Sequence, residues 1–255
     1  MKNISFLVIM LLAMSCTGSN KTSSNTAQKE DSVKVAASVD SSASKPATAT
    51  AQVNSNITTD NSMSGRKTRL IYGPASKVTC SDGTFIEFNK DGNIVREKTY
   101  KSSPIVEYHY VNKNKYKIDN DTYNITYTKN TRIEKWDKEE GLGEAYYEFD
   151  NKGRLLKESP MHYDYELITA QYYYKDNDLL PYKIVSEVGD EQGSETTASL
   201  YTYKTIDNNG NWLSCDINNT TVIETNDIDE NGNNKSKKET KKENESLTRK
   251  IEYYQ

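Results

Sequence analysis

Residues 88–98 read FNKDGNIVREK: an aromatic residue precedes a polar turn with one glycine, and an aliphatic pair follows it. Close relatives of this stretch begin at Phe149 (FDNKGRLLKES) and at Ile206 (IDNNGNWLSCD). An Asn or Asp side chain opens such a turn by bonding its own backbone, and Gly closes it at positive φ, where a side chain costs on the order of 1–2 kcal/mol. Each copy therefore predicts a tight turn between two antiparallel strands, a β-hairpin.

Further turn signals recur along the chain, and most of them follow a run rich in Tyr, Thr and Ile. The predicted turns lie at Gly92, Asn114, Asn130, Gly153, Asn177, Gly210 and Gly232. Runs of this composition bounded by Asn, Asp and Gly are typical of strands. In residues 84–88 and 145–149 aromatic side chains fall on both alternate faces, which favours a twisted or curled sheet.

No part of the chain past residue 67 carries a sustained 3.6-residue apolar stripe, so we expect little helix. The predicted fold is all-β, a repetitive antiparallel β-hairpin meander over residues 67–255. The composition suits thin, partly hydrated sheets: 34% of the residues are hydrophobic, and 19 tyrosines outnumber 4 phenylalanines and 2 tryptophans. A tyrosine ring packs while its hydroxyl stays hydrated. The net charge of −4 argues against nucleic acid as a partner.

The N-terminus has the features of an export signal. An apolar run over residues 4–13 follows Lys2 and is too short to span a bilayer, so residues 1–15 are interpreted as a signal peptide. The sequence AMSC at residues 13–16 resembles the lipobox of bacterial lipoproteins. That resemblance implies cleavage before Cys16 and a diacylglyceryl group on its sulfur, which would hold the chain on a membrane. An ordinary signal peptide with a chance cysteine is the alternative.

Thr17 follows the cysteine where an Asp would retain such lipoproteins at the inner membrane, so the sorting rule implies the outer membrane and leaves its face open. Residues 17–66 contain no aromatic side chain and consist mainly of Ser, Thr, Asn, Ala, Lys and Gln. Such a segment buries too little apolar area to offset its ordering entropy. Residues 16–66 are therefore predicted to form a lipidated, disordered tether, and the folded part is expected to begin near residues 67–70.

Three copies of the turn, in residues 88–93, 149–154 and 207–212, resemble the YD repeats of Rhs-type and wall-associated bacterial proteins. The usual form of that repeat is an aromatic residue, Asp, two spacers, Gly, then Asn or Arg and an apolar residue. The resemblance covers residues 70–255, although several units lack the Gly. It implies an antiparallel sheet that can spiral, in large relatives as a shell around a toxin or as a carbohydrate-binding surface. MORN-like repeats of antitoxin-type proteins are the second family that the spacing resembles.

The sequence predicts no catalytic residues, no metal site and no cofactor. Neither His109 nor His162 has a Cys or His at ligand spacing. Carboxylates are plentiful, but no spacing marks out the facing pair that a glycosidase needs. Cys80 and Cys215 can pair in an exported protein. A meander, however, separates an early strand from a late one unless the sheet curls round, so we expect free thiols.

Two further features have a binding interpretation and a structural one. Trp136 and Trp212, with the tyrosine ladders, are candidates for stacking on sugar rings, but cross-strand packing is the interpretation we favour for most of these aromatics. The Lys/Glu run at residues 235–250 could contact acidic lipid or polysaccharide. A solvated loop and an edge strand protected by its charges are the interpretation we favour.

Together these features predict a lipoprotein of the bacterial envelope that acts as a non-enzymatic binding or scaffolding module, with a protein or a glycan as partner. The first alternative is an immunity or accessory protein of a toxin system, which the relatives of both repeat families suggest. The second is a glycan-active enzyme, which would require two carboxylates facing each other in a cleft lined by Trp or Tyr.

Overall fold

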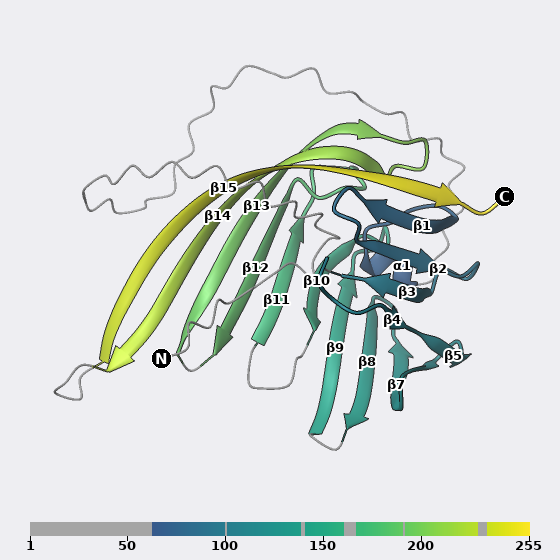
Figure 1. Cartoon of the computed structure of the whole chain (residues 1–255), viewed down its shortest axis with the longest axis horizontal. Coiled ribbons are helices and arrows are strands. Elements are labelled where there is room, and N and C mark those ends of the chain that lie inside the picture. The colour runs from purple at the N-terminus through teal and green to yellow at the C-terminus, as the bar shows by residue number, and fades with distance from the viewer. Residues whose placement is uncertain (1–62, 100, 139–140, 161–166, 191, 229–233) are drawn as a thin grey trace.

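The computed structural model describes residues 63–99, 101–138, 141–160, 167–190, 192–228 and 234–255 (Figure 1). The predicted all-β fold is confirmed, since this part of the chain holds strands and a single four-residue helix, α1 (Gly65–Thr68). The strands are β1 (Ala75–Cys80), β2 (Phe85–Phe88), β3 (Ile94–Lys98), β4 (Val106–Glu107), β5 (His109–Asn112), β6 (Lys115–Ile118), β7 (Asp121–Tyr127), β8 (Thr131–Lys138), β9 (Gly141–Phe149), β10 (Leu155–Pro160), β11 (Leu167–Tyr173), β12 (Lys183–Asp190), β13 (Gly193–Ile206), β14 (Trp212–Ile228) and β15 (Asn234–Tyr253).

In these ranges no helix combines the length and the apolar composition that crossing a membrane would require. The predicted signal peptide, the predicted lipidation site Cys16 and residues 17–62 of the predicted tether lie outside the described residues.

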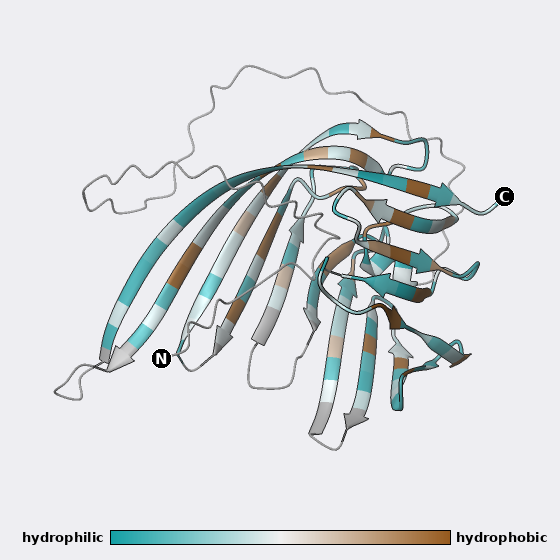
Figure 2. Cartoon of the chain, viewed as in Figure 1, coloured by the Kyte–Doolittle hydropathy of each residue, from teal (hydrophilic) through white to brown (hydrophobic). Residues whose placement is uncertain are grey.

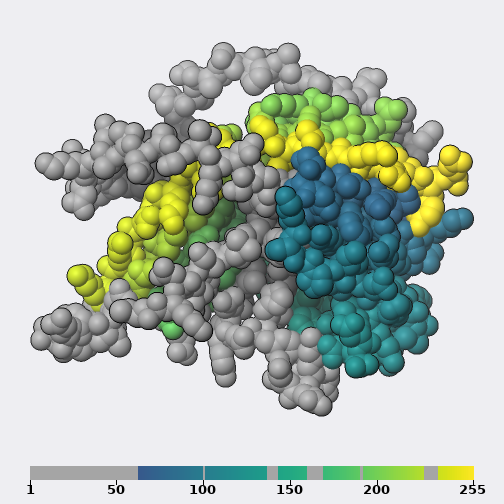
Figure 3. Space-filling view, viewed as in Figure 1, coloured from purple at the N-terminus to yellow at the C-terminus, as the bar shows by residue number. Residues whose placement is uncertain are grey.

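The strands form one antiparallel meander that curls round until its first and last strands pair. The order across the sheet is β4-β3-β2-β1-β15-β14-β13-β12-β11-β10-β9-β8-β7-β6-β5. Figure 3 shows the first strands lying against the last one on the surface of the molecule. Curling therefore places the early strand β1 and the late strand β14 on the two sides of β15. Cys80 on β1 and Cys215 on β14 are thus not far apart, as they would be in a meander that did not curl.

One residue bridges the remaining gap in the sheet. The two edge strands, β4 and β5, are consecutive in the chain and only Tyr108 lies between them. Its N–H donates to the carbonyl of Val95 in β3 at 2.9 Å, and its ring centroid lies 5.5 Å from that of Tyr116 in β6. The sheet is consequently nearly closed, with Tyr108 in contact with both sides of the gap.

Three glycine turns share one geometry. In each five-residue turn the first N–H donates to the fifth carbonyl at 2.8–2.9 Å, and the glycine N–H at position four donates to the first carbonyl at 2.9–3.1 Å. The first side-chain oxygen accepts the fifth N–H at 2.9–3.0 Å. These turns are Asn89–Asn93, Asp150–Arg154 and Asp207–Asn211, and φ is 84° at Gly92, 74° at Gly153 and 84° at Gly210. Gly232 lies outside the described residues.

A fourth turn, Cys80–Thr84, has the same pair of backbone hydrogen bonds, and its Gly83 has a φ of 87°. Its first residue is a cysteine, which lacks the oxygen that accepts the fifth N–H in the other three turns. Instead the side chain of Asp82 accepts the N–H of Thr84 at 2.9 Å. This turn is not among those predicted from the sequence, and its first position carries neither the Asn nor the Asp that opens the other three.

The segment of residues 63–74, which we call the inner segment, connects three separate apolar clusters. Leu70 packs in a cluster with side chains of β9 to β12, Ile71 in a cluster with β1, β2 and β3, and Tyr72 against a cluster of β1, β14 and β15. Ser64 and Arg66, which the sequence analysis placed in the tether, are also buried. The packed part of the chain therefore begins a few residues earlier than residue 67.

Backbone carbonyls explain the burial of Arg66. Its Nε donates to the carbonyl of Ala75 at 2.9 Å, and its Nη2 donates to those of Asn89 and Lys90 at 2.7 and 3.3 Å. A buried guanidinium needs such partners because an unpaired buried donor is destabilising. These bonds fix the inner segment to the turn at Gly92.

The last three strands extend well beyond the apolar clusters. Pairing of β14 with β15 runs from Ser214 opposite Thr248 to Ile228 opposite Asn234. We call the part of β13, β14 and β15 formed by residues 193–199, 218–228 and 234–246 the blade. Figure 2 shows mostly hydrophilic residues along β15 in the blade, and all of residues 235–244 are exposed.

Candidate functional site

The inner face of the curled sheet carries a buried network of arginine, glutamate and tyrosine. Arg132 and Glu134 alternate with one residue between them on β8, so both point inward, and Arg132 Nε lies 2.7 Å from Glu134 Oε1. Tyr116 Oη donates to the other carboxylate oxygen at 2.5 Å, and Arg132 Nη1 donates to the carbonyl of Met63 at 2.9 Å. Arg132 is 2% exposed and Glu134 is 8% exposed.

A second set of the same kind lies beside α1. Arg69 Nη2 is 3.4 Å from Glu97 Oε2, and the hydroxyl of Tyr108 donates to the other oxygen of Glu97. Burial, followed by the charge of Glu97, raises the pKa of Tyr108. The bridge between the edges of the sheet is therefore also fixed to the inner segment through one shared carboxylate.

Glu158 on β10 is the most deeply buried carboxylate of the three. It is 2% exposed and accepts a hydrogen bond from Tyr172 Oη at 2.8 Å. Burial raises the pKa of Glu158 to about 8, although the charge of Arg69 and the Tyr172 hydrogen bond act in the opposite direction. A carboxyl group in this position is protonated at neutral pH.

Tyrosines surround these carboxylates, as they could in a glycosidase site, but the oxygens of Glu134 and Glu97 are already bonded within the protein. Both oxygens of Glu134 and both of Glu97 have a partner on a neighbouring strand or on the inner segment. A general acid or nucleophile needs an oxygen free to reach the substrate. The contacts assign these groups to holding the sheet around residues 63–74.

Trp136 belongs to an aromatic ladder on the same inner face. Its ring centroid lies 5.3 Å from that of Tyr123, which stacks on Tyr116 at 4.8 Å with an interplanar angle of 4°. The ring lies directly over Gly143 of β9, where an added Cβ would come within 2.0 Å of it. Trp136 is half-buried, and its indole N–H makes no hydrogen bond although it is buried. Gly143 of β9 therefore covers one face of the Trp136 ring.

Trp212 lies in a different place and is 3% exposed. The guanidinium of Arg249 lies 3.8 Å from its ring centroid, and Arg249 Nε donates to its carbonyl at 2.6 Å. Because the ring is buried and covered by a cation, it offers no open face to a sugar. The two tryptophans belong to different apolar clusters, so the structure does not bring them together as one stacking platform.

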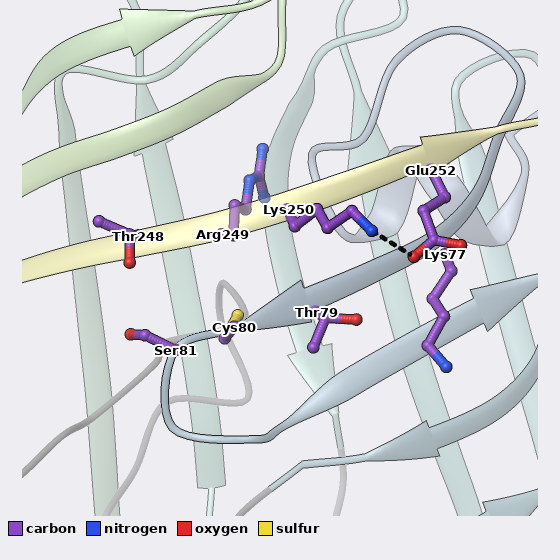
Figure 4. A pocket seen from close by; sticks show the side chains of 8 residues that line it. All are labelled: Lys77, Thr79, Cys80, Ser81, Thr248, Arg249, Lys250 and Glu252. Atoms are coloured by element: carbon purple, nitrogen blue, oxygen red, sulfur yellow. Dashed lines mark hydrogen bonds and ion pairs between the residues drawn. The ribbon is translucent and has the colours of Figure 1, made fainter.

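A pocket of about 530 Å³ lies where β1 pairs with β15, and we call it the seam pocket (Figure 4). It is lined by Lys77, Thr79, Cys80, Ser81, Thr248, Arg249, Lys250 and Glu252. Three of these residues are cationic, one is anionic and three carry hydroxyl groups.

Figure 4 shows Arg249 extending away from Thr79 and Ser81, in agreement with its contact with Trp212. The cations that remain at the seam pocket are Lys77 and Lys250. Lys77 Nζ lies 2.9 Å from Glu87 and Lys250 Nζ lies 3.2 Å from Glu252, so both are fixed in part by carboxylates. This pocket was not predicted from the sequence, because its two strands lie at opposite ends of the folded part of the chain and only the curling of the sheet pairs them.

The cysteines and histidines form no reactive centre in the described residues. Cys215 is a free thiol that is 1% exposed, and burial raises its pKa to about 12. It is not bridged to Cys80, although both side chains belong to the same apolar cluster. Cys80 is itself disulfide-bonded, so the expectation of a free thiol is confirmed for Cys215 and wrong for Cys80. His109 is exposed on β5, whereas His162 lies outside the described residues. In the same ranges no three His, Cys, Asp or Glu side chains are grouped so that they could hold a metal ion.

No protein-family model matches the chain, and neither a curated protein nor a solved structure matches it.

Proposed function

We propose that the chain is a lipoprotein of the bacterial envelope, anchored through Cys16, that acts as a non-enzymatic binding or scaffolding module. The signal peptide and the lipobox-like AMSC sequence support the address. The repeated turn, with the same hydrogen bonds at Gly92, Gly153 and Gly210, supports the kinship with YD repeats that the sequence suggests. The outer membrane is the location that Thr17 favours.

The observation that carries the binding role is the polar seam pocket, which lies outside the buried arginine–glutamate pairs Arg132–Glu134 and Arg69–Glu97. Lysines and hydroxyl groups line it, and Figure 4 shows Ser81 near Thr248, with Thr79 further along β1 below Lys250. Such side chains suit a hydroxyl-rich ligand with acidic groups, because ammonium groups bind carboxylates or phosphates while threonine and serine donate to or accept from hydroxyls. An acidic glycan of the envelope is the partner that this chemistry fits best.

Binding is tested by passing the purified full-length chain over immobilised acidic and neutral envelope polysaccharides. The Lys77→Ala/Lys250→Ala variant should lose retention on the acidic polysaccharide, while Lys113→Ala/Lys129→Ala, which removes two exposed lysines elsewhere, should keep it. Equal retention of both variants, or no retention of the unaltered chain, would overturn the glycan-binding role of the seam pocket.

The anchor is tested separately in cells. A Cys16→Ala change should move the chain from the membrane fraction to the soluble fraction, and mass spectrometry of the unaltered chain should show a diacylglyceryl group on Cys16. A membrane-bound Cys16→Ala variant would show that another feature holds the chain there.

A further inference from the structure

The outer edge of β15 in the blade has no strand paired to it within the described ranges. From residue 234 to 248 β15 pairs with β14 on one side, and β1 takes up the other side only from Arg249 onward. Figure 1 shows this part of β15 as the border of the sheet. A long edge with free N–H and C=O groups is a template for another strand. The question is which strand it fits.

The charges along this edge have an order that is complementary to itself. On β15 the odd-numbered residues point to the inner face, as the buried Leu247 and Arg249 do. The inward series is Lys235, Lys237, Glu239, Lys241, Glu243 and Glu245. Read in the opposite direction, every lysine of this series is replaced by a glutamate and every glutamate by a lysine.

Two copies of the edge can therefore pair antiparallel about a two-fold axis at Thr240. In that register Lys235 faces Glu245 of the second copy, Lys237 faces Glu243, and Glu239 faces Lys241. The two-fold axis repeats each of these three pairs, which gives six cross-strand ion pairs and no like-charged pair on the inner face. Opposite charges directly across an antiparallel pair are stabilising, and like charges are destabilising.

Among the neighbouring registers that keep both inner faces on the same side of the sheet, only this one has no like-charged pair on the inner face. A shift by two residues in one direction places Glu239 opposite its own copy and Lys237 opposite Lys241. The same shift in the other direction places Lys241 opposite its own copy and Glu239 opposite Glu243. The charge order thus selects one alignment, as side-chain pairing does in natural sheets.

The outer face adds one kind of unfavourable contact, between two lysines, which the two-fold axis repeats. Ser236 would face Asn244, Thr240 would face its own copy, and Lys238 would face Lys242. Lys238 Nζ already lies 2.5 Å from Glu224 on β14, so its charge is partly neutralised before a second copy approaches.

We propose that residues 235–245 of β15 are the interface of a homodimer in which two blades join edge to edge into one continuous sheet. The occupant of the free edge is a second copy of this chain, selected by the self-complementary series of lysine and glutamate. The competing interpretation is that these charges only keep other strands away from the edge.

Charge reversal distinguishes the two interpretations in the full-length chain, with mass measured by sedimentation at several concentrations. Lys237→Glu alone places two glutamates opposite each other twice per dimer, and Glu243→Lys alone does the same with lysines. Each single variant should weaken dimerisation about tenfold or more, whereas the double variant Lys237→Glu/Glu243→Lys should dimerise like the unaltered chain. Lys113→Glu, the same charge change at an exposed turn, should have no effect.

Mixing provides a sharper measurement. When Lys237→Glu and Glu243→Lys chains are combined, all positions 237 and 243 face opposite charges, so the mixed dimer should form although neither variant pairs well with itself. A chain that remains monomeric in every case, or a double variant that does not recover, would overturn the proposed interface.

Cross-linking tests the register in cells that express the full chain. Thr240 faces its own copy, and residues directly opposite in an antiparallel pair have Cα atoms about 4.5–5.5 Å apart, within the range of a disulfide. Thr240→Cys should therefore give a covalent dimer on oxidation. Ser236→Cys should not, since the two copies of this residue would lie roughly 27 Å apart, eight residues at about 3.4 Å each. Cross-linking of both variants, or of neither, would contradict the two-fold axis at Thr240.

Discussion

Replacing two glycines by alanine separates the backbone strain of a turn from the contact between that turn and the inner segment. Gly83 and Gly92 occupy the same position in two copies of the five-residue turn, with φ of 87° and 84°. An added Cβ at Gly83 would meet no atom within 4 Å. At Gly92 it would lie 3.1 Å from both Cβ and Oγ of Ser64 and 3.3 Å from Nη1 of Arg66.

The two variants should therefore differ in stability. Gly83→Ala should lower the free energy of unfolding by about 1–2 kcal/mol, the price of a side chain at positive φ. Gly92→Ala has the same strain and must also displace buried atoms, which adds about 1–3 kcal/mol. For a domain of this size the added term corresponds to a melting temperature roughly 2–12 °C lower.

Urea unfolding followed by circular dichroism measures both values. Ser64→Gly in the Gly92→Ala background removes two of the three close contacts, so the two changes should be coupled in a double-mutant cycle. No such coupling should exist between Ser64→Gly and Gly83→Ala. Equal effects of the two alanines, with no coupling to Ser64, would refute the packing of residues 63–66 against the turn. An unchanged Gly83→Ala variant would refute the strained turn.

Three other substitutions test the interior. Burial raises the pKa of Glu158 to about 8 from 4.5, so the stability that its protonated form provides is complete below about pH 4.5 and is lost as the pH rises through 8. Glu158→Gln should flatten the unfolding free energy over this window, while the exposed Glu107→Gln should not. Arg132→Met leaves the buried Glu134 without a cation, bonded only by the Tyr116 hydroxyl, and should cost about 3–5 kcal/mol in urea unfolding. Asn211→Ala removes two hydrogen bonds to the backbone of Tyr72 and should lower the melting temperature, whereas the exposed Asn208→Ala should leave it unchanged.

The turns were predictable from the sequence because their chemistry is local. Asp150, Gly153 and Arg154 lie within five residues of one another, and the hydrogen bonds that define the turn connect only these positions. The same holds for the strands on either side of each turn. Such local signals predict an array of hairpins and a domain with almost no helix, and the structure has both.

The inner segment was not predictable in the same way. Arg66 and Arg69 are residues that a sequence analysis assigns to the surface, and their partners are carbonyls and a carboxylate on distant strands. Nothing in the local sequence around Arg66 indicates that Asn89 will lie beside it. The sequence signal that remains is the apolar triplet Leu70-Ile71-Tyr72, which is too short to identify a buried element on its own.

The seam pocket and the buried carboxylates escaped prediction for a related reason. Arg132, Glu134 and Trp136 occupy every second position of β8 and therefore share one face of the strand. The sequence alone would allow this face to be exposed, and it is buried because the sheet curls around it. The seam pocket needs β1 beside β15, a pairing between the two ends of the folded chain. Long-range pairing depends on the curvature accumulated over all the strands, which no single stretch specifies.

Closure of the sheet also explains why this polar chain exposes so few strand edges. A meander of this length has two edges, and each would expose backbone groups to other strands. Curling places these edges next to each other at β4 and β5, where the Tyr108 N–H bonds to β3 on one side and its ring packs at a tilt against Tyr116 of β6 on the other. The pairing of β1 with β15 then covers only the last part of β15, because β1 is short and the blade is long. The fold thus leaves one extended edge in the described chain, and that edge carries the alternating lysines and glutamates that a second copy could match.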